Sequence, residues 1–219
     1  DRYFEHLVNR IMTTPLPLIR LVDDDDDYRA SQSFLLSSLG WELKDWADPG
    51  EFLAQDDTKR PGCLVLDLRM PGMTGLEVQQ ALENRGSTLP IIFLTGHGDV
   101  TTAVRTLTHG AVDFIEKDSD PMRLVEAVKK AVAASACEFQ KTTEKESKRQ
   151  LFATLTPREQ EILRLAAKGL ANKDIADQLS IGVVTVKMHR GNAFAKIGAQ
   201  GALQAYKWLE AAGLTEPAA

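Results

Sequence analysis

The chain has 219 residues, of which 43% are hydrophobic, and this is enough material for one or two globular domains with a sizeable core. No stretch approaches the roughly 20 apolar residues that a membrane-spanning helix needs, and no secretory signal pattern opens the chain. The sequence therefore predicts a cytoplasmic protein without membrane contact. The net charge of −5 divides unevenly, because the part from Lys141 onward carries 12 basic and 8 acidic residues and the preceding part carries 14 and 23. An acidic part followed by a basic part predicts two domains, of which the second could meet phosphate backbones.

Residues 1–14 precede the first clear pattern, and we expect them to be an N-terminal extension outside the fold. Met12 and Asp1 are both candidates for the native start, and in the first case the segment Asp1–Ile11 is foreign to the protein. The two cysteines, Cys63 and Cys137, fit no metal-ligand spacing. Each lies among apolar residues, which favours a buried, reduced thiol over a disulfide.

Between residues 15 and 136, short apolar runs alternate with amphipathic segments. The runs predict strands at 18–22, 41–45, 63–66, 91–94 and 113–115, and the segments predict helices at 28–39, 51–55, 76–84, 100–109 and 122–136. The runs look buried on both faces, as parallel strands are. Five β–α units of this kind predict a doubly wound α/β domain with a five-stranded parallel sheet over residues 15–136.

The rest of the chain follows a helical period only. Residues 137–153 are charged, which predicts a helical or flexible linker. The next helix starts at Thr156-Pro157, where Thr156 and Glu159 can form a capping box, and it ends at Gly169. Further helices are predicted at 171–179, 183–197 and 203–209, with a tight turn at Ser180–Gly182 as in a helix-turn-helix pair. The sequence thus predicts an all-α domain of four helices over residues 154–214.

Five polar side chains stand at the carboxyl ends of the predicted parallel strands: Asp23, Asp24, Asp67, Thr95 and Lys117. In a doubly wound sheet these ends border one crevice. Clustered carboxylates there suit Mg²⁺, which prefers oxygen ligands. A carboxylate beside the cation could accept a phosphoryl group, and the lysine and the threonine could bind its oxygens. Singly, each residue has an ordinary explanation as a solvated turn, strand end or surface charge, so the hypothesis depends on their coincidence.

The segments Val22–Asp24, Asp67–Gly75, Leu94–Asp99 and Ala111–Lys117 resemble the motifs of bacterial receiver domains, most closely those of the FixJ/NarL group. The resemblance covers about Leu18 to Ala136 and implies a flavodoxin-like fold. It implies that Asp67 is the phosphoacceptor. It also implies that Mg²⁺ is held by the carboxylates of Asp23, Asp24 and Asp67 and by the backbone carbonyl of Arg69.

The same resemblance assigns roles to three further residues and one face. Thr95 and Phe114 would form a switch pair, and Lys117 would bind the phosphate. The face from about Val100 to Ala136 would mediate dimerisation on phosphorylation. One departure lies beside this site, because receiver domains usually have Pro after the lysine, often with a cis peptide bond, and this chain has Asp118. A cis bond before a non-proline residue costs roughly 3 kcal/mol, so we expect the loop after Lys117 to differ from that of the family.

The predicted helix at 183–197 carries groups that suit DNA. The second helix of such a pair enters the major groove, where Lys and Arg reach phosphates or guanine edges and Met188 could contact a thymine methyl. The segments Leu155–Glu159, Gly169–Ala176 and Thr185–His189 resemble the LuxR/NarL-type tetrahelical domain over about Leu155 to Ala212. The resemblance implies base-edge or phosphate contacts from Lys187, Met188, Arg190 and position 191, and phosphate contacts from Asn172, Lys173 and Thr185.

Two glycines depart from the pattern of that domain. Gly182 stands at the usual serine cap, which should cost only a few tenths of a kcal/mol. Gly191 lies inside the recognition helix, where glycine costs roughly 1 kcal/mol relative to alanine and removes a side chain that often contacts DNA.

Both sets of motifs on one chain predict a two-component response regulator and not an enzyme. A sensor histidine kinase would phosphorylate Asp67, and the active homodimer would bind double-stranded DNA and contact RNA polymerase, as an activator of transcription. Two alternatives remain open. A phosphatase or phosphotransferase could use an aspartyl phosphate, although a haloacid-type phosphatase would have Asp at the position of Arg69. A DNA-binding protein gated by protein contact would need no phosphorylation, and Asp118 gives that alternative some weight.

Overall fold

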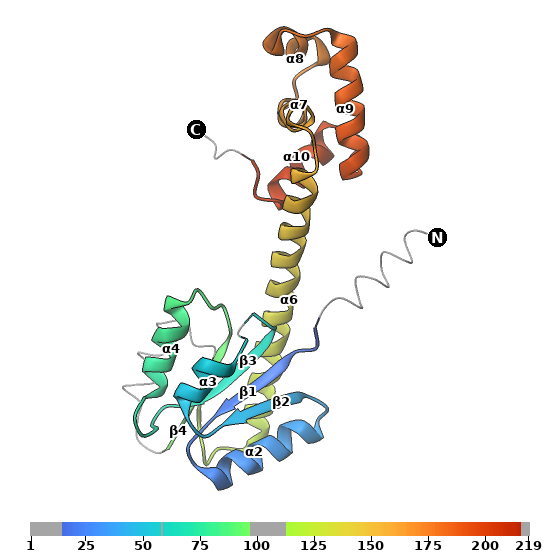
Figure 1. The fold of residues 1–219 in the computed structure, drawn as a ribbon. Coiled ribbons are helices and arrows are strands. Elements are labelled where there is room, and N and C mark those ends of the chain that lie inside the picture. The colour runs from blue at the N-terminus through green and yellow to red at the C-terminus, as the bar shows by residue number, and fades with distance from the viewer. Residues whose placement is uncertain (1–14, 58, 97–112, 216–219) are drawn as a thin grey trace. The chain divides into compact units, whose positions relative to one another are not determined.

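The computed structural model describes residues 15–57, 59–96 and 113–215, and the chain divides into two compact units, Asp1–Phe139 and Gln140–Ala219 (Figure 1). The predicted N-terminal extension, residues 1–14, and the predicted helix at 100–109 lie outside the described residues. Within those residues, no helix combines the length and the apolar character that crossing a membrane requires.

The first unit contains a sheet of five parallel strands. They are β1 (Leu18–Val22), β2 (Glu42–Trp46), β3 (Gly62–Asp67), β4 (Ile91–Thr95) and β5 (Asp113–Glu116), in the order β2-β1-β3-β4-β5. β1, β3 and β4 are buried along their whole length, as their unbroken apolar runs predicted. The doubly wound, flavodoxin-like sheet expected from the sequence is confirmed.

Helices cover both faces of this sheet (Figure 1). On one face, α2 (Asp26–Ser38) and α6 (Pro121–Ala153) pack on a core that includes Ile19, Val65 and Ile92. On the other face, α3 (Pro49–Gln55) and α4 (Gly75–Asn84) pack on a core that includes Leu66 and Phe93. Burying a side chain of this size contributes about 1.5–3 kcal/mol, so the two cores hold the strand ends in a fixed register.

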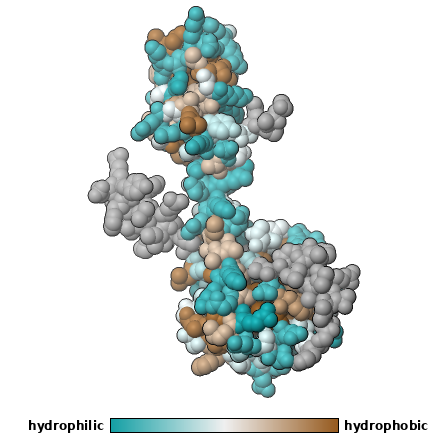
Figure 2. Space-filling model, turned by 180° about the vertical axis from the view of Figure 1, so that it is seen from behind, coloured by the Kyte–Doolittle hydropathy of each residue, from teal (hydrophilic) through white to brown (hydrophobic). Residues whose placement is uncertain are grey.

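Helix α6 is longer than predicted. The sequence places a helix end near Ala136, but the helix continues through the whole linker segment to Ala153. The residues from 137 to 153 include neither Pro nor Gly, so nothing in them interrupts the backbone hydrogen bonds. Residues 140–147 are exposed, and Figure 2 shows hydrophilic side chains over the middle of this helix.

The cysteine prediction is correct for one residue and wrong for the other. Cys63 on β3 is a fully buried free thiol, and burial raises its pKa to about 12. Cys137 is also free, but it is exposed. The helical turn of α6 places it away from the apolar stripe that packs on the sheet, which ends near Val132.

The second unit contains the four predicted helices after α6. They are α7 (Pro157–Ala167), α8 (Asn172–Leu179), α9 (Val183–Ile197) and α10 (Ala202–Ala211). The expected capping box is present, with Thr156 and Glu159 bonding to each other's backbone N–H groups. Ser180 ends α8 in the left-handed conformation with φ 53°, and Gly182 caps α9 without a side-chain bond. Ile162, Ile175 and Leu209 belong to one core under all these helices, which confirms the tetrahelical prediction.

Candidate phosphoacceptor site and DNA-binding helix

The carboxyl edge of the sheet brings the three predicted aspartates together. β1 and β3 are parallel neighbours with Val22 opposite Leu66, so Asp23 and Asp67 emerge side by side. Both carboxylates are buried, with exposed fractions of 0% for Asp23 and 5% for Asp67, whereas Asp24 is exposed. One carboxylate oxygen from each of the three lies within 4.8 Å of the other two.

Gly75 permits a close approach beside Asp67. A Cβ atom at this first residue of α4 would lie 2.5 Å from the Asp67 carbonyl oxygen and 3.1 Å from the Phe93 ring. The Gly75 N–H also donates to the Leu68 carbonyl oxygen at 3.0 Å. Only glycine therefore lets α4 start directly behind the backbone that carries Asp67.

Lys117 reaches this pocket from the end of β5. Its Nζ donates to Asp23 Oδ1 and to Asp67 Oδ2, both at 3.0 Å. Asp23 Oδ2 lies 2.8 Å from the same ammonium, but without hydrogen-bond geometry. The Lys117 backbone N–H donates to the Thr95 carbonyl oxygen at 2.8 Å, which fixes β5 against β4 at this point.

The residue after Lys117 occupies a simple turn. The Ser119 N–H donates to the Glu116 carbonyl oxygen at 3.0 Å, which closes a four-residue turn with Lys117 and Asp118 at its centre. None of the described peptide bonds is cis. The lysine ammonium thus stays with both aspartates although the next residue is Asp118 and not proline.

Burial and charge act against each other in this pocket. Burial raises the pKa of Asp23, and the hydrogen bond from Lys117 offsets that rise only in part. Burial would lower the pKa of Lys117, but hydrogen bonds and charge from Asp23 and Asp67 outweigh it and raise that pKa. The lysine therefore remains protonated and compensates part of the negative charge.

The donor set fits a hard divalent cation. Counted in their charged forms, three carboxylates and one ammonium sum to a charge of −2, which a dication such as Mg²⁺ would balance. The exposed carboxylate of Asp24 gives such an ion access to water, and Mg²⁺ usually keeps several waters. The Arg69 N–H donates to Asp67 Oδ1 at 3.3 Å, so residue 69 also lies at this site.

The two predicted switch residues lie on neighbouring strands. Thr95 is buried at the end of β4, and its hydroxyl donates to the Gly96 carbonyl oxygen at 2.9 Å. Phe114 on β5 is opposite Phe93 of β4, is half-buried, and packs on the core under α3 and α4. The part of the predicted dimerisation face at 100–112 lies outside the described residues.

Two further residues, Tyr28 and Arg29, border the acidic pocket although no sequence motif indicated them. Arg29 Nη1 donates to the Asp23 carbonyl oxygen at 2.7 Å, and its other nitrogens bond the carboxylates of Asp26 and Asp45. The signal that could have found both is their place in the first turn of α2, directly after the acidic run. Because α2 begins directly after β1, side chains in its first turn lie close to the strand end that carries Asp23.

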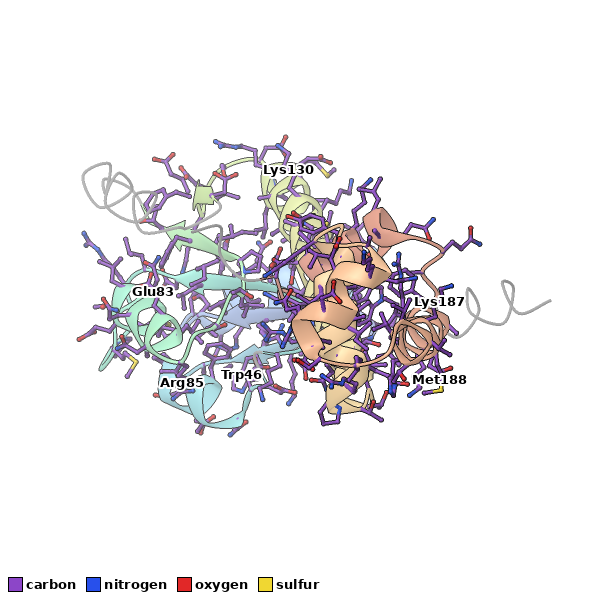
Figure 3. All side chains as sticks on the ribbon, turned by 90° about the horizontal axis from the view of Figure 1, so that it is seen from above. Trp46, Glu83, Arg85, Lys130, Lys187 and Met188 are labelled. Atoms are coloured by element: carbon purple, nitrogen blue, oxygen red, sulfur yellow. The ribbon has the colours of Figure 1, made fainter. Side chains whose placement is uncertain are left out.

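Helix α9 presents several of the predicted DNA-binding residues to solvent. Lys187 is exposed, and Met188 and Val184 have exposed fractions of 54% and 81%. Lys187 and Met188 both lie on α9, as Figure 3 shows. Lys173 on α8 is exposed, and Thr185 is half-exposed near the start of α9. Met188 and Val184 are not part of the core of the second unit, and their exposure suits contact with a partner surface.

Arg190 and Asn172 bond to each other. Arg190 Nη1 donates to Asn172 Oδ1 at 2.7 Å, and its guanidinium carbon lies 5.1 Å from the centre of the Phe194 ring. The guanidinium is therefore held in one orientation between α8 and α9. Gly191 is exposed and a Cβ there would meet open space, so the helix is bare at this position.

Comparison with known proteins assigns a family to each unit. Residues 19–129 match the model of the response regulator receiver domain, and residues 153–209 match that of bacterial regulatory proteins of the luxR family. The chain is 39% identical over 184 residues to the tetrathionate response regulatory protein TtrR of Salmonella typhimurium, covering 83% of this chain and 86% of that protein. It is 37% identical over 188 residues to the transcriptional regulatory protein FixJ of Azorhizobium caulinodans, covering 86% and 89%.

A solved structure supports the same assignment. The response regulator StyR superposes with a TM-score of 0.83 at 37% identity, covering 90% of this chain and 99% of that one. These matches exclude the phosphatase and phosphotransferase alternatives that the acidic cluster left open. The chain belongs to the two-component response regulators in which a receiver domain is joined to a LuxR-family DNA-binding domain.

Proposed function

We propose that this regulator is switched by phosphorylation of Asp67 and that the switched form binds DNA as a homodimer. The receiver domain spans residues 15–136, the linker 137–153 and the DNA-binding domain 154–214. The family matches at 19–129 and 153–209 support these limits. The partner that supplies the phosphoryl group is a sensor histidine kinase, and the regulator acts in the cytoplasm.

The observation that carries this proposal is the contact of one ammonium with two buried carboxylates. Asp67 Oδ2 and Asp23 Oδ1 both accept from Lys117 Nζ at 3.0 Å. A carboxylate oxygen of Asp67 forms a bond to phosphorus while the bond from phosphorus to the kinase histidine breaks. Lys117 pairs with a phosphoryl oxygen and Thr95 donates its hydroxyl to another, which stabilises the charge of the transferring group.

Mg²⁺ is the cofactor of this reaction. The carboxylates of Asp23, Asp24 and Asp67 and the backbone carbonyl of Arg69 would hold it, and it would neutralise charge on the phosphoryl oxygens. Thr95 and Phe114 then change position together and alter the face from Val100 to Ala136, through which two receivers associate.

The dimer places two helix-turn-helix units on two DNA half-sites. Lys187, Met188 and Arg190 contact base edges or phosphates, and Asn172, Lys173 and Thr185 contact phosphates. The exposure of Lys173, Lys187 and Met188 supports this proposal. Bound beside a promoter, the dimer activates transcription through contact with RNA polymerase.

The variant Asp67→Asn tests the acceptor. The full chain is incubated with Mg²⁺ and a ³²P-labelled phosphodonor, and incorporated label is measured over time. The wild type and the control Asp177→Asn, an exposed aspartate on α8, should incorporate label, while Asp67→Asn should not. Incorporation into Asp67→Asn at the wild-type rate would show that another residue is the acceptor.

A further inference from the structure

The ring of Tyr28 forms one wall of the site occupied by the Lys117 ammonium. Lys117 Nζ lies 4.8 Å from the centre of this ring, which is within the range of a cation–π contact. The ring is half-buried and packs against the core between α2, α6 and the sheet. The ammonium therefore contacts two carboxylates and one aromatic ring.

Backbone hydrogen bonds fix Tyr28 relative to the acidic pocket. The Asp25 N–H donates to Asp23 Oδ1 at 3.0 Å, and the Tyr28 N–H donates to Asp25 Oδ1 at 3.0 Å as part of the α2 cap. Asp23 thus accepts from Lys117 and also, through Asp25, sets the turn that carries the ring. The Asp23 carboxylate and the Tyr28 ring, which both contact the Lys117 ammonium, therefore belong to one short segment of the chain.

The Lys117 side chain needs these contacts to stay in one conformation. Its side chain has four rotatable carbon bonds, and ordering it costs rotamer entropy. The turn after it contains Asp118, not a rigid proline. Only 20% of the Lys117 side chain is exposed, so water screens the contact between the ammonium and the ring only in part.

We propose that Tyr28 is a positioning residue for phosphoryl transfer, whose ring face holds the Lys117 ammonium against Asp67. This inference rests on the function proposed above. An ammonium already in place can stabilise the charge of the transferring phosphoryl group without first being ordered. Burial raises the pKa of the Tyr28 hydroxyl to about 12, so the ring is neutral at physiological pH. The ammonium contacts the face of the ring and not the hydroxyl, so a phenylalanine ring at this position would make the same contact.

The test compares phosphorylation rates of the full chain with acetyl phosphate and Mg²⁺. Tyr28→Leu should lower the rate about three- to tenfold, the size of a partly desolvated cation–π contact, and Tyr28→Phe should restore most of it. Phe34→Leu is the matched control, because Phe34 lies on the same helix with 79% of its surface exposed and should leave the rate unchanged. Equal rates for Tyr28→Leu and the wild type would overturn the inference.

A spectroscopic measurement separates positioning from a general loss of structure. The ε-methylene protons of Lys117 should resonate upfield of ordinary lysine in the wild type and in Tyr28→Phe, because the Nζ bonded to this methylene lies over an aromatic ring. They should return to the ordinary position in Tyr28→Leu. Ordinary shifts in the wild type would overturn the inference whatever the rates. If acetyl phosphate and Mg²⁺ do not phosphorylate the wild-type protein at all, the proposed function itself is overturned, and this inference with it.

Discussion

Buried charges in this protein have specific partners, and Arg20 shows this at the scale of one residue. Arg20 lies on β1 with an exposed fraction of 0%. Its Nε donates to Asp56 Oδ2 at 2.5 Å, and its other nitrogens donate to the carbonyl oxygens of Leu18, Asp57 and Arg60. The bonds to Asp56, Asp57 and Arg60 attach the segment between α3 and β3 to strand β1.

Removing the partner of Arg20 should therefore be costly. Asp56→Ala leaves a buried guanidinium without its counter-charge, and we expect a loss of about 3 kcal/mol in the free energy of unfolding. The double variant Arg20→Met/Asp56→Ala should regain part of that loss. Urea denaturation followed by tryptophan fluorescence measures both. A loss below about 1 kcal/mol, the size of an exposed ion pair, would contradict this account.

Glu159 is a second buried charge, in the second unit. Its Oε2 accepts from Lys196 Nζ at 2.7 Å and from the Thr156 N–H at 2.9 Å. The Lys196 hydrogen bond, followed by the backbone bond of Thr156, lowers the pKa of Glu159 below its ordinary value of 4.5. The unfolded state binds this proton at higher pH than the folded state does, so stability rises with pH between the two values.

We expect the stabilisation from Glu159 to be complete above pH 4.5 and to be lost as pH falls through the lowered folded value. In Glu159→Gln, which keeps the shape but cannot ionise, the fall of stability with pH in this range should be shallower. Trp208 is the only tryptophan after residue 140, so a Trp41→Phe/Trp46→Phe background reports on this unit. If stability falls equally steeply with pH in the Glu159→Gln variant and in its parent chain, the lowered pKa of Glu159 does not stabilise the folded unit.

At the scale of elements, the sequence predicted best where burial is complete. The apolar runs of β1 and β4 match the strands within one residue, because a strand buried on both faces leaves no polar position. β2 is mostly exposed, and its predicted range is shifted by one residue. The grouping of the three aspartates with Lys117 could be predicted because parallel topology brings the carboxyl ends of the strands to one edge.

Other features depend on packing that no local pattern contains. The contact of Tyr28 with Lys117 joins residues far apart in the chain and needs the angle at which α2 meets β1. The bond between Arg190 and Asn172 depends on how α8 packs against α9. The end of α6 was misplaced because helix propensity continues past the last buried residue, so the apolar period stops before the helix does.

Gly191 allows a test of helix α9 as an element. A Cβ at this exposed position would meet open space, so Gly191→Ala should raise the stability of the second unit by about 1 kcal/mol through helix propensity. Gly198→Ala is the control, because Gly198 caps the same helix with φ 71° and alanine there should destabilise it. Thermal unfolding in the Trp41→Phe/Trp46→Phe background, followed by Trp208 fluorescence, measures the stability of both variants. Destabilisation by Gly191→Ala would indicate a packing role for this glycine.

At the scale of the whole molecule, the chain separates two kinds of chemistry. The first unit holds a buried acidic pocket, and the second presents exposed lysine and apolar side chains on α8 and α9. The acidic pocket can control the DNA-binding helices only if phosphorylation and DNA binding favour the same state of the protein. Phosphorylation then raises the affinity for DNA, and bound DNA favours the phosphorylated form. Dimerisation is the shared state in the function proposed above.

The direct test is the affinity of the full chain for a DNA sequence selected from a random pool, measured with and without a phosphodonor in Mg²⁺. For the wild type we predict that phosphorylation raises the affinity about tenfold, within the usual range of coupling between two sites, and converts monomer to dimer. Asp67→Asn should show neither change. Wild-type protein that binds the selected DNA equally well before and after phosphorylation would contradict the account.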